Sequence, residues 1–337
     1  MLNLLHLDLL KKGKVLLAFS GGVDSTALFH LLLSHNITFD IAHVNYHTRP
    51  SSDQEAQSAE GLAHAHQLQC YTHSCHLEGK NFEHRARDER YTFLKYLVGK
   101  YDYTCVLTAH QLNDRLEWLM MQFCRGSGLP ELLGIRSHDT RDGMTLIRPL
   151  LEHDRESIEA YLAQHNLVHY IDESNADERY TRNLFRRRFS TPLMQEYREA
   201  IKRSFRYLEE DNATLIENVA IEHIDELFYF RTPRNSHSLI VAIDGVLKSL
   251  GHVMRGNEKE LLKQEKSLVV GRAYAVTVEE DYTFISPYVE ITMQKEFKEK
   301  CRIQKIDPKM RGYLATHPKA YESIRRLKDD QELLRFD

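Results

Sequence analysis

The chain has 337 residues and a formal net charge of −4, and 42% of its residues are hydrophobic and 28% charged. This composition is ordinary for a globular protein of two or three domains and too apolar for a disordered one. The longest apolar stretches, such as 27–33, are far shorter than the ~20 residues that cross a bilayer, so no membrane association is expected. Five cysteines without regular spacing argue against a disulfide framework, and Asp8 makes the apolar N-terminus a poor signal peptide. The protein is therefore predicted to be cytoplasmic, and its oligomeric state is left open.

The first half of the chain alternates short apolar runs with amphipathic stretches. Strands are predicted at 15–19, 39–44 and 105–109, and helices at 25–34, 51–69, 81–98 and 113–124. This alternation is typical of βαβ units, so we predict an α/β fold with a parallel sheet and helices on both faces. Ligands of such sheets bind at the carboxyl ends of the strands. Ser20, His43 and His110 fall at those ends.

The second half of the chain has a different organisation. A helix at 154–164 precedes an Arg-rich segment at 172–188, and charged helical sequence continues after Pro192 to about residue 224. Two helical stretches and three strand-like runs follow within 239–288, and the tail from about 290 shows no clear period. We therefore predict a catalytic domain at 1–195, a helical linker at 196–235 and a smaller mixed α/β C-terminal domain at 236–337.

The segment from Ser20 to Ser25 connects the first strand to the first helix and suits a phosphate group. Gly21 and Gly22 allow a tight turn that brings backbone N–H groups close to an anion, and the helix adds the positive end of its dipole. Asp24 would be repelled by a polyphosphate unless a cation lay between them, so it predicts a Mg²⁺ ion. The loop has no lysine and is not a Walker-type loop. The alternative is a helix cap with two turn glycines.

This loop resembles the signature loop of the PP-loop ATP pyrophosphatase superfamily. The resemblance implies cleavage of ATP between the α and β phosphates and transfer of AMP to a carbonyl oxygen. The superfamily includes GMP and asparagine synthetases, tRNA thiolation enzymes and tRNA(Ile)-lysidine synthetases, and the loop alone does not choose among them.

Further motifs, spread over roughly residues 14–195, resemble the tRNA(Ile)-lysidine synthetases in particular. They are His43-Val44-Asn45 with Arg49, Asn81-Phe82-Glu83, Ala86-Arg87 with Arg90-Tyr91, Ala109-His110 with Asp114 and Glu117, Arg125-Gly126-Ser127-Gly128-Leu129, Leu133-Gly134, Arg148-Pro149-Leu150, Asp172-x-Ser174-Asn175, and Arg182-Asn183-x-x-Arg186 with Pro192. The last two motifs are associated with this family and not with the thiolation enzymes. The chain departs from the family pattern at Tyr46, Ala109, Asn113 and Trp118.

The resemblance implies a two-step reaction with ATP and Mg²⁺ as cofactors. The wobble cytidine of a tRNA(Ile) with a CAU anticodon is adenylated on its C2 oxygen, and the ε-amine of free L-lysine then displaces AMP. Lysine's ammonium needs a carboxylate, and Asp114 and Glu117 lie one helical turn apart on one predicted face. The alternative is a solvated pair of charges.

Other residues of the matched motifs are assigned to ATP. His43 and Arg87 are placed with the ATP-binding residues, and His110 either contacts the α-phosphate or is a polar residue that ends a strand. Arg87 and Arg90 share a helix face and could hold phosphate from ATP or RNA, or form a surface salt-bridge helix with Glu83.

Two clusters of positive charge predict contacts with the tRNA. The first consists of Arg179, Arg182, Arg186, Arg187 and Arg188. Its members at 182 and 186 suit the RNA backbone or a substrate carboxylate, and those at 187 and 188 suit RNA phosphates. The second, at 291–328, has 11 Lys/Arg against 4 Asp/Glu and assigns tRNA binding to the C-terminal domain. The alternative for both is a solvated helix face.

Three other functions compete with this interpretation. A tRNA 2-thiolation enzyme would need a sulfur-carrying cysteine pair or paired C-x-x-C motifs, which this sequence lacks, and the spacing of Cys70, His73, Cys75 and His76 does not predict a metal site. A glutamine-dependent synthetase would need a glutaminase domain, and none precedes the loop. A nucleotide-binding module without activity would need neither the carboxylates nor the Arg-rich segment.

Overall fold

The structure, a computed structural model, describes residues 2–48, 52–77, 79, 82–170 and 181–334. Several residues of the predicted motifs lie outside the described residues, namely Arg49, Ser51, Asn81, Asp172, Ser174, Asn175 and Arg179. The chain divides into two compact units, Met1–Leu208 and Glu209–Asp337, which we call the N-terminal and C-terminal units.

The N-terminal unit is built on a six-stranded sheet with the strand order β3-β2-β1-β4-β6-β5. Its strands are β1 (Val15–Ala18), β2 (Phe39–Asn45), β3 (Cys70–Ser74), β4 (Cys105–Leu107), β5 (His138–Arg141) and β6 (Met144–Ile147). Five of them run parallel, and only β5 is antiparallel to its neighbour β6. The carboxyl ends of β1, β2 and β4 therefore meet at one edge.

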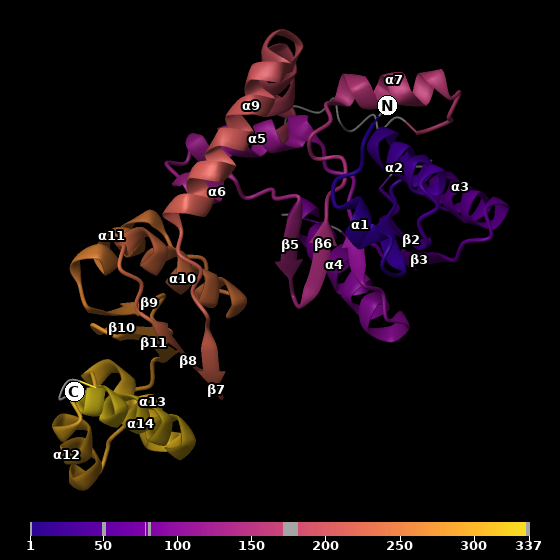
Figure 1. Cartoon of the computed structure of the whole chain (residues 1–337). Helices are drawn as coiled ribbons and strands as arrows, with labels where there is room; N and C mark the ends of the chain where they lie inside the picture. The colour runs from indigo at the N-terminus through magenta and orange to yellow at the C-terminus, as the bar shows by residue number, and fades with distance from the viewer. Residues whose placement is uncertain (1, 49–51, 78, 80–81, 171–180, 335–337) are drawn as a thin grey trace. The chain divides into compact units, whose positions relative to one another are not determined.

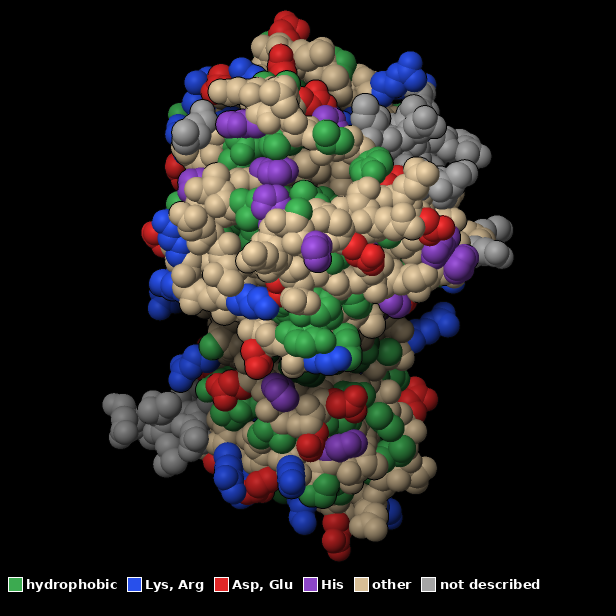
Figure 2. All heavy atoms as spheres, turned by 90° about the vertical axis from the view of Figure 1, so that its right-hand side faces the viewer, with side chains coloured by type: hydrophobic (Ala, Val, Ile, Leu, Met, Phe, Trp, Pro, Cys, Tyr) green, Lys and Arg blue, Asp and Glu red, His purple; other side chains and the backbone are tan. Residues whose placement is uncertain are grey.

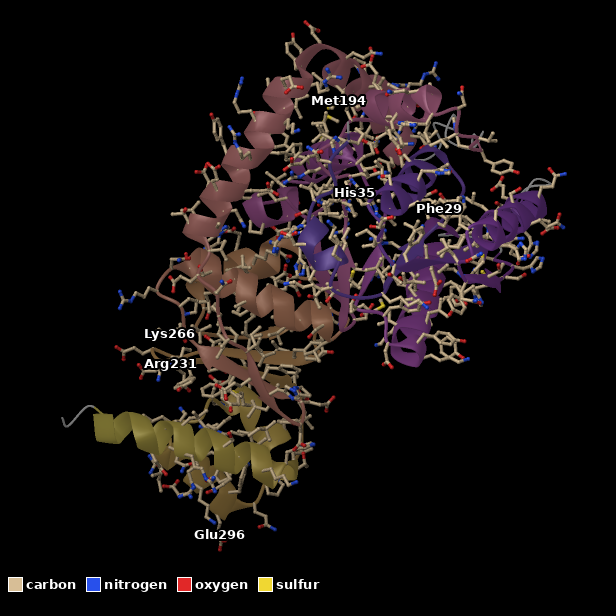
Figure 3. All side chains as sticks on the ribbon, turned by 45° about the vertical axis from the view of Figure 1, so that its right-hand side comes forward. Phe29, His35, Met194, Arg231, Lys266 and Glu296 are labelled. Carbon is tan, nitrogen blue, oxygen red and sulfur yellow. The ribbon has the colours of Figure 1, made fainter. Side chains whose placement is uncertain are left out.

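Helices cover both faces of this sheet (Figure 1). The helices of the unit are α1 (Leu7–Leu10), α2 (Val23–Ser34), α3 (Ser52–Ala65), α4 (Phe82–Tyr101), α5 (Leu112–Phe123), α6 (Leu129–Leu132), α7 (Arg155–Gln164), α8 (Thr181–Phe185), the π-helical turn η2 (Arg186–Ser190) and α9 (Thr191–Leu215), which ends beyond the unit boundary. Apolar side chains of α2, α3 and α7 pack on one face, and those of α4 pack on the other. Phe29 points from α2 into the first of these layers and is fully buried (Figure 3).

Alternation of side chains along β1 explains the two layers. Val15 and Leu17 belong to the cluster with α2, whereas Leu16 belongs to the cluster with α4, and all three are fully buried. A strand buried on both faces reads as a continuous apolar run, as expected for the centre of a parallel sheet. The predicted α/β class and the three predicted strands are confirmed.

The C-terminal unit has an antiparallel sheet with the order β7-β8-β11-β10-β9. Its elements are β7 (Glu222–Ile224), β8 (Leu227–Arg231), α10 (Ser236–Ser249), α11 (Gly256–Gln264), β9 (Ser267–Val270), β10 (Tyr274–Val278), β11 (Tyr282–Pro287), α12 (Lys295–Ile303), α13 (Pro308–Thr316) and α14 (Pro318–Leu334). Helices α10 and α11 pack on one face of the sheet, and α12, α13 and α14 pack on the other.

Two predictions for this part of the chain need correction. The predicted helical linker at 196–235 is helical only to Leu215, because residues 222–231 form β7 and β8 and Tyr229 and Phe230 face opposite sides of the second sheet. The tail, which shows no clear period, forms three helices. These helices, which were not predicted from the sequence, bury Cys301 from α12 and Met310, Tyr313 and Leu314 from α13 against the second sheet.

Within the described ranges, no helix combines the length and the apolar character that a membrane crossing requires. On the face drawn in Figure 2, acidic and basic side chains are interspersed, so no continuous basic surface lies there.

Candidate active site

The loop between β1 and α2 has the geometry of an anion-binding turn. Gly21 has a φ of 78°, a conformation that favours glycine, and Gly22 is the N-cap of α2 in an extended conformation. No side chain of the described residues caps this helix end, so its first N–H groups stay available to an anion. Ser20 Oγ lies 3.1 Å from Ser25 Oγ, which donates to the carbonyl of Gly22 at 3.2 Å. Tyr170 closes the turn from outside, because its N–H donates to the carbonyl of Gly21 at 2.9 Å.

Asp24 lies in the first turn of α2, directly behind this loop. Burial raises its pKa to about 7, and the negative charge of Asp114 acts in the same direction. The charges of Arg155 and Arg186 oppose this rise without cancelling it. Its Oδ1 atom is buried and has no hydrogen-bond partner among the described residues. A buried carboxylate oxygen without a partner is the kind of ligand that Mg²⁺ takes, so Asp24 fits the predicted cation.

Two histidines stand at the carboxyl ends of β2 and β4, and both are neutral at pH 7. His43 Nδ1 donates to the carbonyl of Phe19 at 3.1 Å, which leaves Nε2 as an acceptor, and burial lowers its pKa. His110 Nδ1 lies 2.9 Å from Thr108 Oγ1, and burial lowers the pKa of His110 to about 3. Neither ring brings a positive charge to a phosphate, so each can contribute only a hydrogen bond.

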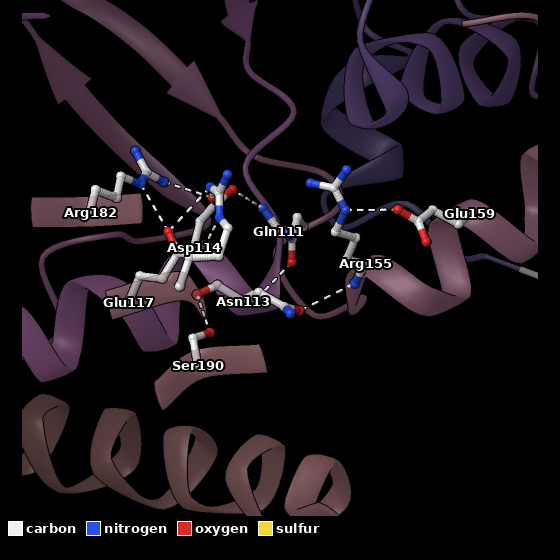
Figure 4. Close-up of polar contacts among 9 residues, drawn as sticks. Gln111, Asn113, Asp114, Glu117, Arg155, Glu159, Arg182 and Ser190 are labelled. Carbon is white, nitrogen blue, oxygen red and sulfur yellow. Dashed lines mark hydrogen bonds and ion pairs between the residues drawn. The ribbon is translucent and has the colours of Figure 1, made fainter. Parts of the chain in front are cut away.

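The two predicted carboxylates form one ion-pair cluster with two of the predicted arginines (Figure 4). Arg182 bridges both carboxylates, with Nε 2.9 Å from Glu117 Oε2 and Nη2 2.6 Å from Asp114 Oδ1. Arg186 Nε lies 2.7 Å from Glu117 Oε1, and its Nη2 lies 3.4 Å from Asp114 Oδ1. The second oxygen of Asp114 accepts the N–H of Gln111 at 3.0 Å in a capping box of α5. We call Asp114, Glu117, Arg182 and Arg186 the ion-pair cluster.

Because the carboxylates of this cluster are buried, the loss of any member should lower the stability of the fold. The side chain of Glu117 is 0% exposed and that of Asp114 11%. Burial alone would raise the pKa of Asp114, but the charges of Arg182 and Arg186 outweigh it, so its pKa lies below the usual value. Removing one member of a buried pair costs ~3–5 kcal/mol, because the partner charge is left uncompensated.

Four of the five arginines that were predicted together lie within the described residues, and they separate into two pairs. Arg182 and Arg186 point at the carboxylates, whereas Arg187 and Arg188 are exposed on the same helical run. Residues four apart lie on one side of a helix, and those one or two positions further along turn away from it. Among the members of the set that the structure describes, Arg187 and Arg188 therefore form the exposed pair.

Arg87 lies apart from the phosphate loop on α4. Its Nη2 donates to the hydroxyl of Tyr91 at 3.5 Å, and its guanidinium lies 5.0 Å from the centre of that ring. Arg141 stacks on the same ring at 3.9 Å. Burial lowers the pKa of Arg87, with a further decrease from the charge of Arg141. The alternative partner Glu83 has a side chain outside the described residues.

Three of the positions that depart from the family pattern have clear structural contacts. Asn113 Oδ1 accepts the N–H of Arg155 at 3.2 Å and so joins α5 to the start of α7 (Figure 4). Tyr46 donates to the carbonyl of Ala86 at 2.7 Å, and Trp118 Nε1 donates to that of Glu131 at 2.7 Å. Sequence reasoning missed Arg155 and Tyr170, since neither belongs to a local motif and each meets the site only through the fold.

Comparisons with known proteins agree with this geometry. Residues 2–193 match the family described as a PP-loop domain. The tRNA(Ile)-lysidine synthase of Wolinella succinogenes is 45% identical over 305 residues, which cover 90% of this chain and 93% of that protein. The chain belongs to the tRNA(Ile)-lysidine synthase family. The synthases of Campylobacter jejuni and Helicobacter pylori are 39% and 34% identical, over 92% of this chain and 95% and 91% of theirs.

Among solved structures, the fold resembles that of the U34-tRNA thiolase NcsA from Methanococcus maripaludis with its [4Fe-4S] cluster. The TM-score is 0.51 at 16% identity, and the match covers 74% of this chain and 85% of that one. A likeness at this identity concerns the fold alone. The five cysteines of this chain are Cys70, Cys75, Cys105, Cys124 and Cys301, and no two of them are spaced as C-x-x-C.

Proposed function

We propose that this protein is a cytoplasmic tRNA(Ile)-lysidine synthase that converts the wobble cytidine of a CAU-anticodon tRNA(Ile) to lysidine. In the first step, the C2 oxygen of the cytidine attacks the α-phosphorus of ATP, and pyrophosphate leaves. In the second, the neutral ε-amine of free L-lysine attacks C2, the C2–O bond breaks, and AMP leaves together with one proton. The observation that carries the proposal is the ion-pair cluster at the same sheet edge as the phosphate loop, in a chain 45% identical to a named synthase.

The phosphate loop is proposed to hold the triphosphate of ATP. The free N–H groups at the start of α2, the hydroxyls of Ser20 and Ser25, and the helix dipole all favour negative charge. Asp24 would hold Mg²⁺, which neutralises phosphate charge during the departure of pyrophosphate. His43 and His110, both neutral, are proposed to donate or accept hydrogen bonds near the nucleotide. Arg87, on α4 at the other face of the sheet, is proposed to add a positive charge that acts on His110.

The two carboxylates of the ion-pair cluster are proposed to have different roles. Both oxygens of Glu117 accept from arginines and its side chain is fully buried, so Glu117 is proposed to hold Arg182 and Arg186 in place. Asp114 is closer to solvent and meets the arginines through one oxygen only. Asp114 is therefore proposed to hold the ammonium of lysine and to accept a proton as the ε-amine becomes nucleophilic.

Binding of the tRNA is assigned to two surfaces. Arg187 and Arg188 are exposed beside the cluster and are proposed to contact phosphates near the anticodon. The C-terminal unit is proposed to hold the body of the tRNA through α12, α13 and α14. Part of its positive charge is used internally, because Arg302 pairs with Glu299 and Lys328 with Glu279. Exposed lysines that have no ion-pair partner among the described residues include Lys295, Lys298 and Lys319.

The decisive experiment measures products with purified protein, ATP, Mg²⁺ and a CAU-anticodon tRNA(Ile) transcript. We expect lysine to be incorporated into the tRNA with one AMP and one pyrophosphate released for each lysine. The matched control is the same transcript with uridine at the wobble position, which should accept no lysine. Product formation that does not depend on lysine, or incorporation into the uridine control, would contradict the proposal.

A further inference from the structure

An exposed apolar row runs along the helical segment that carries the arginines of the ion-pair cluster. It consists of the half-buried Phe185 and of Phe189, Leu193 and Tyr197, which are spaced four residues apart through α8, η2 and α9; α9 is kinked at Tyr197, whose backbone is non-helical (φ −122°, ψ 18°). Phe189, Leu193 and Tyr197 are 45%, 38% and 49% exposed. The rings of Phe185 and Phe189 lie 5.4 Å apart and tilted, so they already form a joined surface. A surface helix ordinarily turns polar side chains to solvent, so this row needs an explanation.

The neighbouring row of the same segment faces the interior. Arg182 and Arg186 reach the carboxylates of α5, and Ser190 and Met194 continue the row as buried residues. Met194 packs with Leu112 of α5 (Figure 3 labels Met194 on this segment). The buried row therefore supplies the apolar contacts that hold this segment on α5. The exposed apolar side chains are additional to those contacts. The exposed row begins at Phe185, which directly precedes Arg186 of the ion-pair cluster in the chain.

The surroundings of the row indicate what kind of partner it fits. Arg187 and Arg188 are exposed on the same turn as Phe189, and η2 itself is a π-helical turn, a rare feature that is frequent at functional sites. Aromatic rings interleaved with arginines are the usual surface for single-stranded nucleotides, because bases stack on the rings while the arginines meet the phosphates. A protein partner would be expected to meet fewer positive charges there.

We propose that this row is a stacking platform for the unpaired bases that flank the target cytidine in the anticodon loop. This inference rests on the proposed function and specifies how the RNA is held there. A base inside a stacked loop cannot place its C2 oxygen at an α-phosphorus, so the neighbouring bases must be held away from it. Phe189 and Tyr197 supply the aromatic faces, and Leu193 lies between them in the sequence. The surface recognises single-stranded RNA by shape and stacking, without reading a base edge.

The test measures binding of an anticodon stem-loop RNA to the full-length protein carrying Phe189→Ala and Tyr197→Ala together. Each stacked base contributes about five- to 150-fold in affinity, so we expect the double variant to bind at least tenfold more weakly. The log–log dependence of affinity on salt should keep its wild-type slope, because no phosphate contact is lost. The KM for the tRNA should rise by a similar factor, while the KM values for ATP and lysine stay unchanged.

Two further variants separate stacking from simple apolar contact. Phe189→Tyr with Tyr197→Phe keeps both rings and should bind as the wild type does, whereas Phe189→Leu with Tyr197→Leu keeps apolar area without rings and should bind as weakly as the alanine variant. The matched control is Tyr96→Ala, whose ring is 57% exposed near the C-terminal end of α4. Because α4 runs antiparallel to the strands, Tyr96 lies towards the opposite edge of the sheet and should have no effect.

The outcomes distinguish this inference from the function on which it rests. Wild-type binding by the alanine or the leucine variant, in a protein that incorporates lysine, would overturn the platform and leave the function intact. A chain that incorporates no lysine and does not bind the stem-loop would overturn both. A wild-type dimer that the alanine variant converts to a monomer would show that the row is a contact between copies, and the platform would be wrong.

Discussion

Asp24 offers the sharpest test of the candidate site, because its burial has a thermodynamic consequence that does not depend on catalysis. Its pKa rises from an ordinary value of 3.8 to about 7, first through burial and then through the charge of Asp114. The folded chain therefore holds this proton more tightly than the unfolded chain between pH 3.8 and 7. Stability falls as pH rises through this window, at about 1.4 kcal/mol for each pH unit, and levels off above pH 7. The full loss is about 4 kcal/mol.

The substitution Asp24→Asn removes this titration while keeping the size of the side chain. We expect the variant to gain stability over the wild type as the pH rises from 4 to 7, until it is more stable by up to about 4 kcal/mol. Urea unfolding followed by circular dichroism, in EDTA and at half-unit pH steps, measures the difference directly. The matched control is Asp8→Asn, which makes the same substitution at an exposed aspartate in the first turn of α1.

Added Mg²⁺ should stabilise the wild type but not Asp24→Asn, and it should therefore reduce the difference in stability between the two proteins. A cation that binds the ionised carboxylate stabilises the folded state by about 2.7 kcal/mol at a hundred times its dissociation constant. Because protons compete for the carboxylate, this stabilisation should weaken below pH 7. The same substitution should abolish release of AMP. A stability difference that is constant between pH 4 and 8 would refute the burial of an unpartnered carboxylate, and wild-type AMP formation by the variant over a range of Mg²⁺ concentrations would refute its place beside pyrophosphate.

The remaining predictions concern lysine and RNA. Asp114→Asn should raise the KM for lysine at least tenfold and slow lysine incorporation more than adenylation, measured as separate single-turnover rates; an unchanged lysine KM in this variant would place the amine site elsewhere. Glu117→Gln should lower both rates and cost up to about 3–5 kcal/mol of stability, because the fully buried carboxylate of Glu117 pairs with both arginines, whose side chains are 39% and 22% exposed. Arg187→Ala with Arg188→Ala should weaken tRNA binding and reduce the log–log salt slope by about two, with ATP binding unchanged. A wild-type slope in that double variant would show that the two arginines do not meet phosphates.

The sequence predicted the parts of the site that are contiguous in the chain. Ser20 to Ser25 is one uninterrupted segment between a strand and a helix, so its backbone geometry follows from local chemistry. The pairing of Arg182 with Glu117, 65 residues apart, depends on how α8 packs on α5 and could not be read from spacing. These arginines were therefore assigned to the RNA backbone or a substrate carboxylate, and Asp114 and Glu117 were considered separately.

Strands at the sheet edges escaped the sequence analysis for a related reason. β3 is only partly buried along its length, and its sequence from Cys70 to Ser74 has no strong apolar run. β5, from His138 to Arg141, contains no apolar residue at all and is held by backbone pairing with β6. An edge strand contacts a single neighbour, so its side chains carry little of the periodicity by which buried strands are found. The central strand β1 has a neighbouring strand on each side, and its residues Val15, Leu16 and Leu17 are fully buried. It therefore forms an apolar run that the sequence analysis identified.

The phosphate loop and the ion-pair cluster are linked through charge. Asp114 raises the pKa of Asp24, and Arg186 of the cluster lowers it, so the two carboxylates share one electrostatic environment at the end of the sheet. Such a coupling is reciprocal: whatever neutralises Asp24 also eases the ionisation of Asp114, and whatever neutralises Asp114 eases that of Asp24. A cation at Asp24 and an ammonium at Asp114 would each neutralise one of these carboxylates, whereas their own like charges repel each other. The two carboxylates would therefore offer each positive group a site of its own, Asp24 for the cation that accompanies ATP and Asp114 for the ammonium of lysine.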